Sequence, residues 1–323
     1  MYKKLFLLII LIFYLMFIIM SIPNEKIEFK SSFKPSVIQN DISQYLLNKE
    51  NLYTDIIPGV KKRIIWHKDK NKKTAISVIY IHGFSATSEE IRPLPDLISK
   101  ELNANLFYTR LSGHGRKPET MSQGSISNWV YDLHEAIEIG SRIGNKIIIM
   151  SSSTGGTLSA TAALNKKLSD KILGFIFISP NFGINNALAR LLTWPFSKYW
   201  IRFFVGDKFV TEPRNEKNSQ FWTFNYPSKS LVPMANLVKR VNICDFKDVK
   251  KPAFFYFSLD DKVVDPLKTI NFISNWGGPT KSINVKMTKF DDKYSHVLAG
   301  DIISPNQTQK AKSEILKWVN SLN

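Results

Sequence analysis

Apolar and polar positions alternate in blocks along most of the chain after residue 62. Short apolar runs predict strands at residues 63–66, 76–81, 105–110, 146–150, 173–179, 253–257 and 284–288. Longer amphipathic stretches predict helices at residues 88–102, 127–143, 156–168, 265–276 and 307–322. Because strands that alternate with helices are typical of crossover units, we predict an α/β fold with a mostly parallel, doubly wound sheet.

The first 23 residues form a separate hydrophobic segment. Lys3 and Lys4 precede an uncharged run over residues 5–22, and Pro23 ends it. The run is longer than the roughly 7–15 residues of most signal-peptide cores, and it lies at the short end of the lengths that span a membrane. The lysines favour an N-terminus in the cytoplasm. We therefore expect residues 1–23 to be an uncleaved signal anchor, a transmembrane helix of a single-pass bacterial cell-membrane protein with its domain outside the cytoplasm. The alternative is a cleaved signal peptide and a secreted or periplasmic protein.

Residues 24–62 are polar and carry one predicted helix over residues 41–51, so we expect a membrane-proximal spacer before a domain at 63–323. Within the domain, about residues 181–233 interrupt the alternation of strands and helices. This interval holds many aromatic residues: Trp194, Phe196, Tyr199, Trp200, Phe203, Phe204, Phe209, Phe221, Trp222, Phe224 and Tyr226. An insertion of this kind at the end of a strand predicts a lid over an apolar pocket; the alternative is that the rings fill the core.

The overall composition is that of an ordinary globular protein, with 44% hydrophobic and 22% charged residues. There are 44 Lys and Arg against 27 Asp and Glu, a net charge of +17. The basic residues are scattered and accompany no nucleic-acid motif, so we expect no nucleic-acid partner and relate the charge to solubility and to attraction by phospholipid. Cys244 is the one cysteine, which excludes an intramolecular disulfide and a cysteine-based metal cluster.

Residues 147–156 carry the strongest chemical signal in the sequence. An apolar run there ends abruptly at Ser151-Ser-Ser-Thr-Gly-Gly156, and a helix-compatible segment follows. This is the layout of a nucleophile elbow, G-x-S-x-G, in which a strained turn between strand and helix exposes a serine. Ser153 is then the nucleophile, with Ser151 in the place of the first glycine and Gly155 in the place of the second. The alternative is a serine-rich helix cap.

A nucleophilic serine needs a base, an acid that orients the base, and donors for the oxyanion. Five histidines occur in the chain, and only His296 lies in its last third, in the sequence D-D-K-Y-S-H-V after the last predicted strand. Acidic residues follow the strand at 253–257, in the sequence S-L-D-D-K-V-V-D-P over residues 258–266. Two glycine-containing turns, H-G-F at 82–84 and L-S-G-H-G at 111–115, follow the earlier strands.

With the motifs HGFSA, RLSGHG, SSSTGG, SLDDKVV and SHV in this order, residues 64–322 resemble an α/β-hydrolase. More narrowly, the chain is similar to the bacterial branch around monoacylglycerol lipases, small carboxylesterases and serine-aminopeptidase-like proteins. The resemblance implies a central sheet, a lid after the sixth core strand, and no metal or organic cofactor. It also implies that His82 and His114 brace the site, and that Trp129 and Asp132 support the core below it.

The resemblance also assigns roles to individual residues. Ser153 is the expected nucleophile, His296 the base and Asp261 the acid, and the backbone amides of Phe84 and Thr154 are the expected oxyanion donors. Asp260 remains the rival acid. Ser258 stands where related enzymes commonly carry glycine. Asp265 is followed by Pro266, so we expect it to cap the next helix.

These assignments predict a serine hydrolase that cleaves carboxylic esters through a Ser-His-Asp triad. The aromatic insertion and the expected anchor favour a small-molecule or lipid-like acyl ester as substrate. One alternative is an aminopeptidase or amidase of the same branch, which would need an acidic group such as Glu212 or Glu216 to bind a free amine. Another alternative is a membrane-tethered binding protein that keeps the fold without catalysis.

Overall fold

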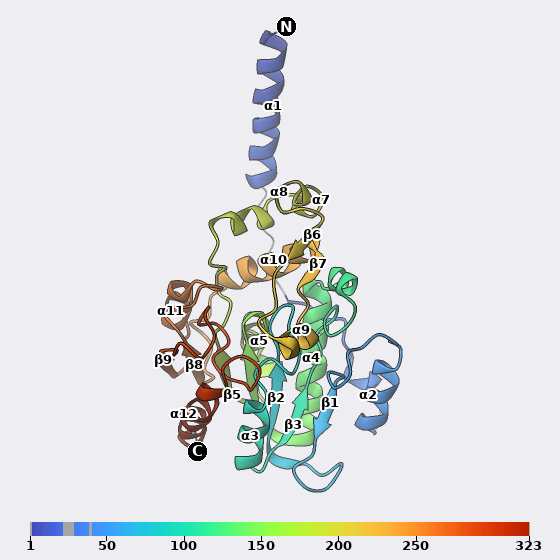
Figure 1. The fold of residues 1–323 in the computed structure, drawn as a ribbon, viewed down its shortest axis with the longest axis vertical. Helices are drawn as coiled ribbons and strands as arrows, with labels where there is room; N and C mark the ends of the chain where they lie inside the picture. Colours follow the sequence, from blue (N-terminus) through green and yellow to red (C-terminus); the bar gives the residue numbers. More distant parts are fainter. Residues whose placement is uncertain (1, 22–28, 39–40, 323) are drawn as a thin grey trace.

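A twisted central sheet organises the molecule (Figure 1), for which a computed structural model describes residues 2–21, 29–38 and 41–322. Within these residues, seven strands follow the spatial order β1-β3-β2-β4-β5-β8-β9. Their bounds are Arg63–Ile65 (β1), Thr74–Ile81 (β2), Asn105–Tyr108 (β3), Gly144–Ser152 (β4), Ile172–Ile178 (β5), Ala253–Phe257 (β8) and Thr280–Asn284 (β9). Strand β1 is antiparallel to β3, and the other neighbours are parallel, which confirms the predicted sheet.

Alternate residues of each strand face opposite sides of this sheet, and helices cover both sides. Val78 and Tyr80 of β2 belong to one buried cluster, with residues of α3 (Leu94–Glu101) and α12 (Thr308–Asn320). Ile79 and Ile81 belong to the other cluster, which includes residues of α4 (Ile126–Ile143), α5 (Thr154–Ala163) and α10 (Leu231–Asn242). Because both faces are buried, the strands are continuous apolar runs, as parallel sheets require.

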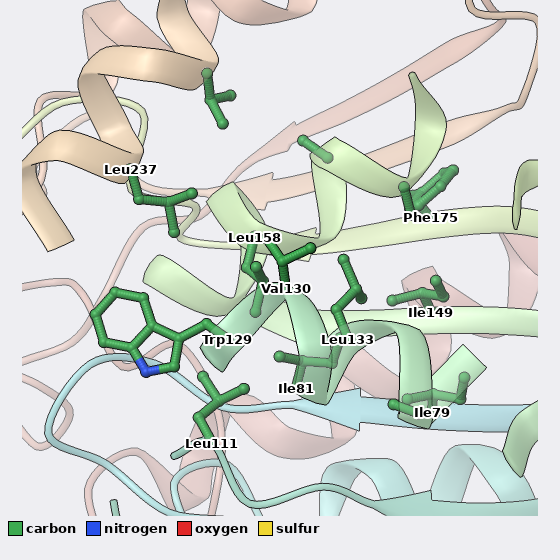
Figure 2. Close-up of a cluster of buried hydrophobic side chains, with 14 of the residues drawn as sticks. Ile79, Ile81, Leu111, Trp129, Val130, Leu133, Ile149, Leu158, Phe175 and Leu237 are labelled. Carbon is green, nitrogen blue, oxygen red and sulfur yellow. The ribbon is translucent and has the colours of Figure 1, made fainter. Parts of the chain in front are cut away.

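Figure 2 shows the second of these faces at close range, with Val130 and Leu133 of α4 and Leu158 of α5 over the isoleucines of the sheet. All of the labelled side chains are at most 2% exposed. The packed face fixes helix α5 against strand β4, and the turn between these two elements carries Ser153.

The predicted helices occur with shifted boundaries. Helix α3 begins six residues later than predicted, because residues 88–93 form turns that end at Pro93. The helix predicted at 156–168 is broken at Asn165, whose side chain caps a separate helix α6 (Lys166–Ser169). Helix α11 (Pro266–Ser274) begins after Asp265, whose side chain accepts a hydrogen bond from the Leu267 amide and confirms the predicted cap.

The last strand was predicted at 284–288, and this placement is wrong: β9 covers Thr280–Asn284. It is the edge strand of the sheet and is mostly exposed, so its sequence T-K-S-I-N has no apolar run. The apolar signal comes instead from Val285, which is buried directly after the strand and donates its amide to the Phe257 carbonyl.

The N-terminal segment forms helix α1 (Tyr2–Ser21). Among the residues that the structure describes, no helix has both the length and the apolar character needed to cross a membrane. The expected anchor stays a prediction, and the expected end of that segment at 22–23 lies outside the described residues.

The expected spacer at 24–62 is not an extended linker where the structure describes it. Residues 35–37 form a short 3₁₀ helix, η1 (Pro35–Val37), and helix α2 covers Ile42–Glu50, one residue shorter at each end than the predicted helix at 41–51. Phe33, Ile38, Ile42 and Leu46 join the hydrophobic core. The polar composition was misleading because Glu50 and Lys62 are buried in ion pairs with residues far along the chain.

The insertion leaves the sheet after β5, the fifth strand in chain order, and not after a sixth strand as the resemblance implied. It contains the following elements: η3 (Ala187–Thr193), α7 (Ser197–Trp200), α8 (Arg202–Val205), β6 (Lys208–Val210), α9 (Glu216–Phe221), β7 (Asn225–Pro227) and η4 (Ser228–Ser230). Its aromatic residues fall into two groups. Trp194, Phe196, Tyr199, Phe203 and Phe204 are exposed, whereas Trp200 and the rings after residue 204 are buried or half-buried.

Candidate active site

Ser153 lies at the abrupt turn between strand β4 and helix α5. Its φ of 49° and ψ of −121° place a non-glycine residue in a strained region of backbone space. The turn is held from both sides, because the Ser153 amide donates to the Ile178 carbonyl at 3.0 Å and its carbonyl accepts from the Asn181 amide at 3.0 Å. The strain is thus balanced by hydrogen bonds to the end of the neighbouring strand.

The residues two before and two after Ser153 show why this turn needs small side chains. A Cβ atom on Gly155 would lie 2.4 Å from the Ile81 carbonyl oxygen and 2.6 Å from that of His82, which no side chain tolerates. Ser151 is fully buried on β4, and its hydroxyl lies 3.3 Å from the Ile176 carbonyl oxygen. Serine in place of the usual glycine therefore fits, with its hydroxyl bound to a neighbouring strand.

His296 links Ser153 to Asp261. Its Nε2 atom lies 3.0 Å from Ser153 Oγ, and its Nδ1 atom lies 2.8 Å from Asp261 Oδ2. The other oxygen of Asp261 accepts the amides of Val263 and Val264 at 2.8 and 2.9 Å, which orients the carboxylate. The structure thus brings together the three residues expected from distant motifs.

Asp260, the rival acid, lies outside this arrangement. Its side chain is 58% exposed and pairs with Lys286 at 3.1 Å. Asp261 is instead 4% exposed, and it is Asp261 that contacts His296. Ser258, in the place of the usual glycine, is buried, and its hydroxyl accepts the Asp260 amide at 3.2 Å.

The environment of His296 raises the pKa of its imidazole. Burial is the largest single effect and lowers the pKa of His296, but the carboxylates of Asp261, Asp292 and Glu90 together raise it above its ordinary value, with Asp261 contributing most. A neutral His296 that donates Nδ1–H to Asp261 leaves Nε2 free to accept the Ser153 hydroxyl. The imidazolium formed on accepting that proton is stabilised by the same carboxylate.

The expected oxyanion donors flank this group. The backbone amides of Phe84 and Thr154 have no hydrogen-bond acceptor among the described residues. Thr154 is the first residue of α5, where an unpaired N–H and the positive end of the helix dipole favour negative charge. Both amides are therefore available to a substrate oxygen.

A buried carboxyl group that the sequence reasoning missed supports the turn at residues 82–84. Glu90 Oε2 accepts the Gly83 amide at 2.8 Å and the Tyr80 hydroxyl at 2.9 Å. Burial raises the pKa of Glu90 above its ordinary value, against the opposing effect of these two donors. Gly83 is confined, since a Cβ there would lie 2.7 Å from Glu90 Oε1 and 3.0 Å from Ser153 Cβ.

The histidines of the two glycine-containing turns are buried and structural. The Leu111 amide donates to His82 Nε2 at 3.1 Å, so Nδ1 carries the proton and donates to the Gly83 carbonyl at 2.9 Å. Burial lowers the pKa of His82 well below 6.5 and that of His114 to about 4. The His114 ring packs on the Phe84 ring, 5.5 Å between centroids. Both therefore brace the site in the neutral state.

Helix α4 holds the turn at 111–115 from below. Asp132 Oδ2 accepts both the amide and the hydroxyl of Ser112 at 2.7 Å, and Trp129 Nε1 donates to the Ser112 carbonyl at 3.0 Å. Asp132 also pairs with the buried Lys62 at 2.8 Å, and Glu50 binds Arg110 through two contacts of 2.8 Å. This confirms the supporting positions of Trp129 and Asp132, and it ties α2 to the site.

A small polar pocket lies beside this turn, lined by residues that include Tyr53, Arg110, Ser112, Arg116 and Asp132. Its basic side chains are already paired, Arg110 with Glu50 and Arg116 with Asp55. In the part of the chain that the structure describes, no group of His, Cys, Asp and Glu side chains is arranged to hold a metal ion.

The sheet with its strand–serine–helix turn defines the class: the chain is an α/β-hydrolase. Residues 72–290 match the family described as serine aminopeptidase, S33, and the chain belongs to that family. It is also 24% identical over 191 residues to a thermostable monoacylglycerol lipase from Bacillus sp. (strain H-257), a match over 59% of this chain and 72% of that protein.

Solved structures share the fold at low sequence identity. A structure from work on the metagenome-derived lipolytic enzymes LipS and LipT superposes with a TM-score of 0.66 at 15% identity, covering 82% of this chain and 99% of that one. The monoacylglycerol lipase of Paleococcus ferrophilus gives a TM-score of 0.57 at 16% identity, over 81% and 100% of the two chains. A soluble variant of the monoglyceride lipase of Saccharomyces cerevisiae gives 0.58 at 12% identity, over 84% and 97%. The family match and the monoacylglycerol lipase relative thus place the chain among the α/β-hydrolase enzymes that include lipases and esterases.

Proposed function

We propose that the protein is a serine carboxylester hydrolase in which Ser153, His296 and Asp261 form a catalytic triad. The observation that carries the proposal is the continuous contact from Ser153 Oγ through the His296 ring to Asp261 Oδ2, at 3.0 and 2.8 Å. A nucleophile, a base and an orienting acid in this geometry are what acyl transfer requires.

The proposed reaction has two steps. Ser153 Oγ forms a bond to the ester carbonyl carbon as its proton passes to His296 Nε2, and the alcohol leaves with that proton when its C–O bond breaks. A water molecule then gives a proton to His296 and attacks the acyl carbon. The carboxylic acid leaves, and Ser153 recovers its proton from His296.

The amides of Phe84 and Thr154 are the proposed donors to the negative oxygen of each tetrahedral intermediate. One such donor typically contributes roughly 3 kcal/mol to lowering the barrier. Glu90 supports the first donor because it accepts the neighbouring Gly83 amide and fixes the loop. The α5 N-terminus supports the second.

A lipid-like acyl ester is the proposed substrate class. One support is the likeness to proteins named monoacylglycerol lipases. Another is the first half of the insertion, where Trp194, Phe196, Tyr199, Phe203 and Phe204 are exposed. We propose that about residues 181–233 act as a lid whose exposed rings meet the acyl part of the substrate.

The test is hydrolysis of p-nitrophenyl esters of increasing acyl length by the full chain in mild detergent, with Ser153→Ala as control. We expect hydrolysis by the wild-type protein and loss of at least about 10³-fold in the variant. Equal activity of the two proteins would contradict the proposal.

An aminopeptidase or amidase is the second candidate, and the family description, serine aminopeptidase, favours it. The acidic residues expected to bind a free amine, Glu212 and Glu216, are both exposed on the insertion. Faster turnover of aminoacyl-arylamides than of acyl esters, with a further loss in Glu212→Gln or Glu216→Gln, would favour this candidate. A non-catalytic binding protein is the outcome if neither substrate is hydrolysed.

The extracytoplasmic, membrane-bound location is a separate proposal that rests on the sequence alone, on the two lysines and the uncharged run at 5–22. Cell fractionation with carbonate extraction tests it. Recovery of the full-length chain in the extracted membrane fraction agrees with an anchor, and recovery in the soluble fraction contradicts it.

A further inference from the structure

We propose that Arg214, in the insertion, and Asp292 form an ion pair that positions His296 in line with Ser153. This inference rests on the proposed function, because it concerns how the base of that triad is held. It makes the second half of the insertion, about residues 211–226, a structural part of the catalytic site and not only a cover over it.

Asp292 is the centre of the loop that carries His296. Its side chain is completely buried. One carboxylate oxygen accepts the amides of His296 and Val297 at 3.1 and 2.7 Å, and the other accepts the Tyr294 amide at 2.8 Å. The loop needs this support because Ser295, next to His296, has a positive φ of 53°. A carboxylate that binds the backbone on both sides of Ser295 fixes the direction in which the His296 side chain leaves the loop.

Arg214 supplies the opposite charge from a different part of the chain. Its Nη1 atom donates to Asp292 Oδ1, and its guanidinium lies 4.7 Å from the centre of the Tyr294 ring. The Arg214 side chain is 24% exposed, so solvent reaches the ion pair only from the Arg214 side. A buried carboxylate without this partner would carry a large desolvation cost.

The backbone around Arg214 is itself fixed. The Arg214 amide donates to Asn218 Oδ1 at 3.0 Å, and Asn215 Nδ2 donates to the Ile302 carbonyl at 2.8 Å. Arg214 therefore reaches Asp292 from a defined position and not from a free loop.

The same part of the insertion also contacts the loop of the expected oxyanion donor. The Thr223 amide donates to the Ser85 carbonyl at 2.8 Å, and the rings of Tyr226 and Phe84 lie 5.6 Å apart. Residues 211–226 thus connect the two loops that must keep their relative position during the reaction. The exposed rings at 194–204 lie outside these contacts.

The charges around His296 predict how its pKa should respond to substitutions in this ion pair. Asp261, Asp292 and Glu90 are the acidic groups that act on its ring, and Arg214 offsets Asp292. Removing the negative charge of Asp292 should lower the pKa of His296, whereas removing the positive charge of Arg214 should raise it. A purely structural effect of either substitution would not shift this pKa in opposite directions.

The experiment compares Asp292→Asn, Arg214→Gln and Arg214→Lys with the wild-type full chain. Arg202→Gln is the matched control, because it removes the same charge from the same insertion at an exposed pair with Asp207. The His296 ring is titrated by NMR in protein with ¹³C-labelled histidine, with His296→Asn for assignment. Ester hydrolysis is measured against pH in parallel.

We expect opposite shifts in Asp292→Asn and Arg214→Gln, a His296 titration close to wild type in Arg214→Lys, and no shift in Arg202→Gln. In Arg214→Gln, kcat should fall roughly tenfold or more with little change in KM, because Arg214 is expected to orient the base and not to bind substrate. Recovery of most of kcat in Arg214→Lys agrees with a charge-dependent role.

Unchanged titration of His296 in both charge-removing variants would overturn the inference, even if the wild-type protein hydrolyses esters. The NMR titration needs no turnover, so it stays decisive if the wild-type protein proves inactive. In that case the proposed function fails, and the opposite shifts would still establish that the pair acts on His296.

Discussion

The Nδ1 atom of His296 lies 2.8 Å from Oδ2 of Asp261, although His296 comes 35 residues later in the chain. The neighbouring Asp260 points to solvent and pairs with Lys286. Two adjacent aspartates therefore differ in burial and in partner. Substituting each in turn distinguishes the effect of an acid that orients His296 from the effect of a surface charge.

Asp261→Asn should lower kcat by roughly 10⁴-fold if Asp261 orients His296, because an amide donor stabilises the wrong imidazole tautomer. Activity of the wild-type protein should fall as pH decreases through the pKa of His296, because the protonated imidazole cannot act as the base. The raised pKa of His296 places this fall above pH 6.5. In the variant this fall should move to lower pH, because the loss of the carboxylate lowers the pKa. The measurement is a pH profile of kcat/KM.

Asp260→Asn is the control for that substitution, with the same change of charge one residue away. We expect activity within about twofold of wild type, since an exposed ion pair contributes little. A large loss in Asp260→Asn with none in Asp261→Asn would assign the acid to Asp260 instead.

The stability of Glu90→Gln relative to the wild-type protein should increase as pH rises. The folded-state pKa of Glu90 is raised, so its contribution to stability is complete below the unfolded pKa and is lost as pH rises through the folded one. Glutamine has no such loss. Thermal unfolding of both proteins from pH 4 to 8 measures the difference in Tm; a constant difference across this range would contradict the raised pKa.

Ser151→Gly and Gly155→Ala should have very different effects on the turn at Ser153. The first removes a hydroxyl that lies 3.3 Å from a carbonyl, so activity should stay within about threefold and stability should fall by about 0.5–1 kcal/mol. The second places a methyl group 2.4 Å from the Ile81 oxygen and should cost about 1–3 kcal/mol and most of the activity. Ester hydrolysis and urea denaturation test both; tolerance of alanine at 155 would argue against this turn geometry.

Glu50→Ala should destabilise the domain by about 3–5 kcal/mol, because it leaves the buried guanidinium of Arg110 without its carboxylate. Lys72→Ala, which breaks the exposed pair with Asp69, is the matched control and should change stability by less than about 1 kcal/mol. Urea denaturation measures both. An equally small effect of the two substitutions would mean that residues 41–62 are a dispensable spacer.

Much of the sheet could be predicted from the sequence, because strands buried on both faces leave continuous apolar runs such as residues 147–150. The motifs after these runs, together with the late histidine motif, also identified Ser153, Asp261 and His296, which the fold brings within hydrogen-bond distance. Local composition was sufficient for Ser153 and Asp261 since each follows shortly after a buried strand, whereas His296 was identified by its late position in the order of the motifs.

Other features depend on contacts between distant residues and leave little local signal. The edge strand β9 is polar, so the apolar pattern pointed to the residues after it. The sequence suggests that Glu50 and Lys62 are exposed. In the fold they are buried, because Glu50 pairs with Arg110 and Lys62 pairs with Asp132 and Glu135. Asp292 lay within the quoted histidine motif, but nothing in the sequence connects it with Arg214.

Labelling with a fluorophosphonate probe tests the central claim most directly, because the probe reacts with a serine that an adjacent base activates. The full-length protein, Ser153→Ala and His296→Asn are treated with the probe, and the modified peptide is mapped by mass spectrometry. The account predicts one adduct, on Ser153, in the wild-type protein, with none in Ser153→Ala and strongly slowed labelling in His296→Asn. Absence of labelling in the folded wild-type protein, or an adduct on another serine, would contradict it.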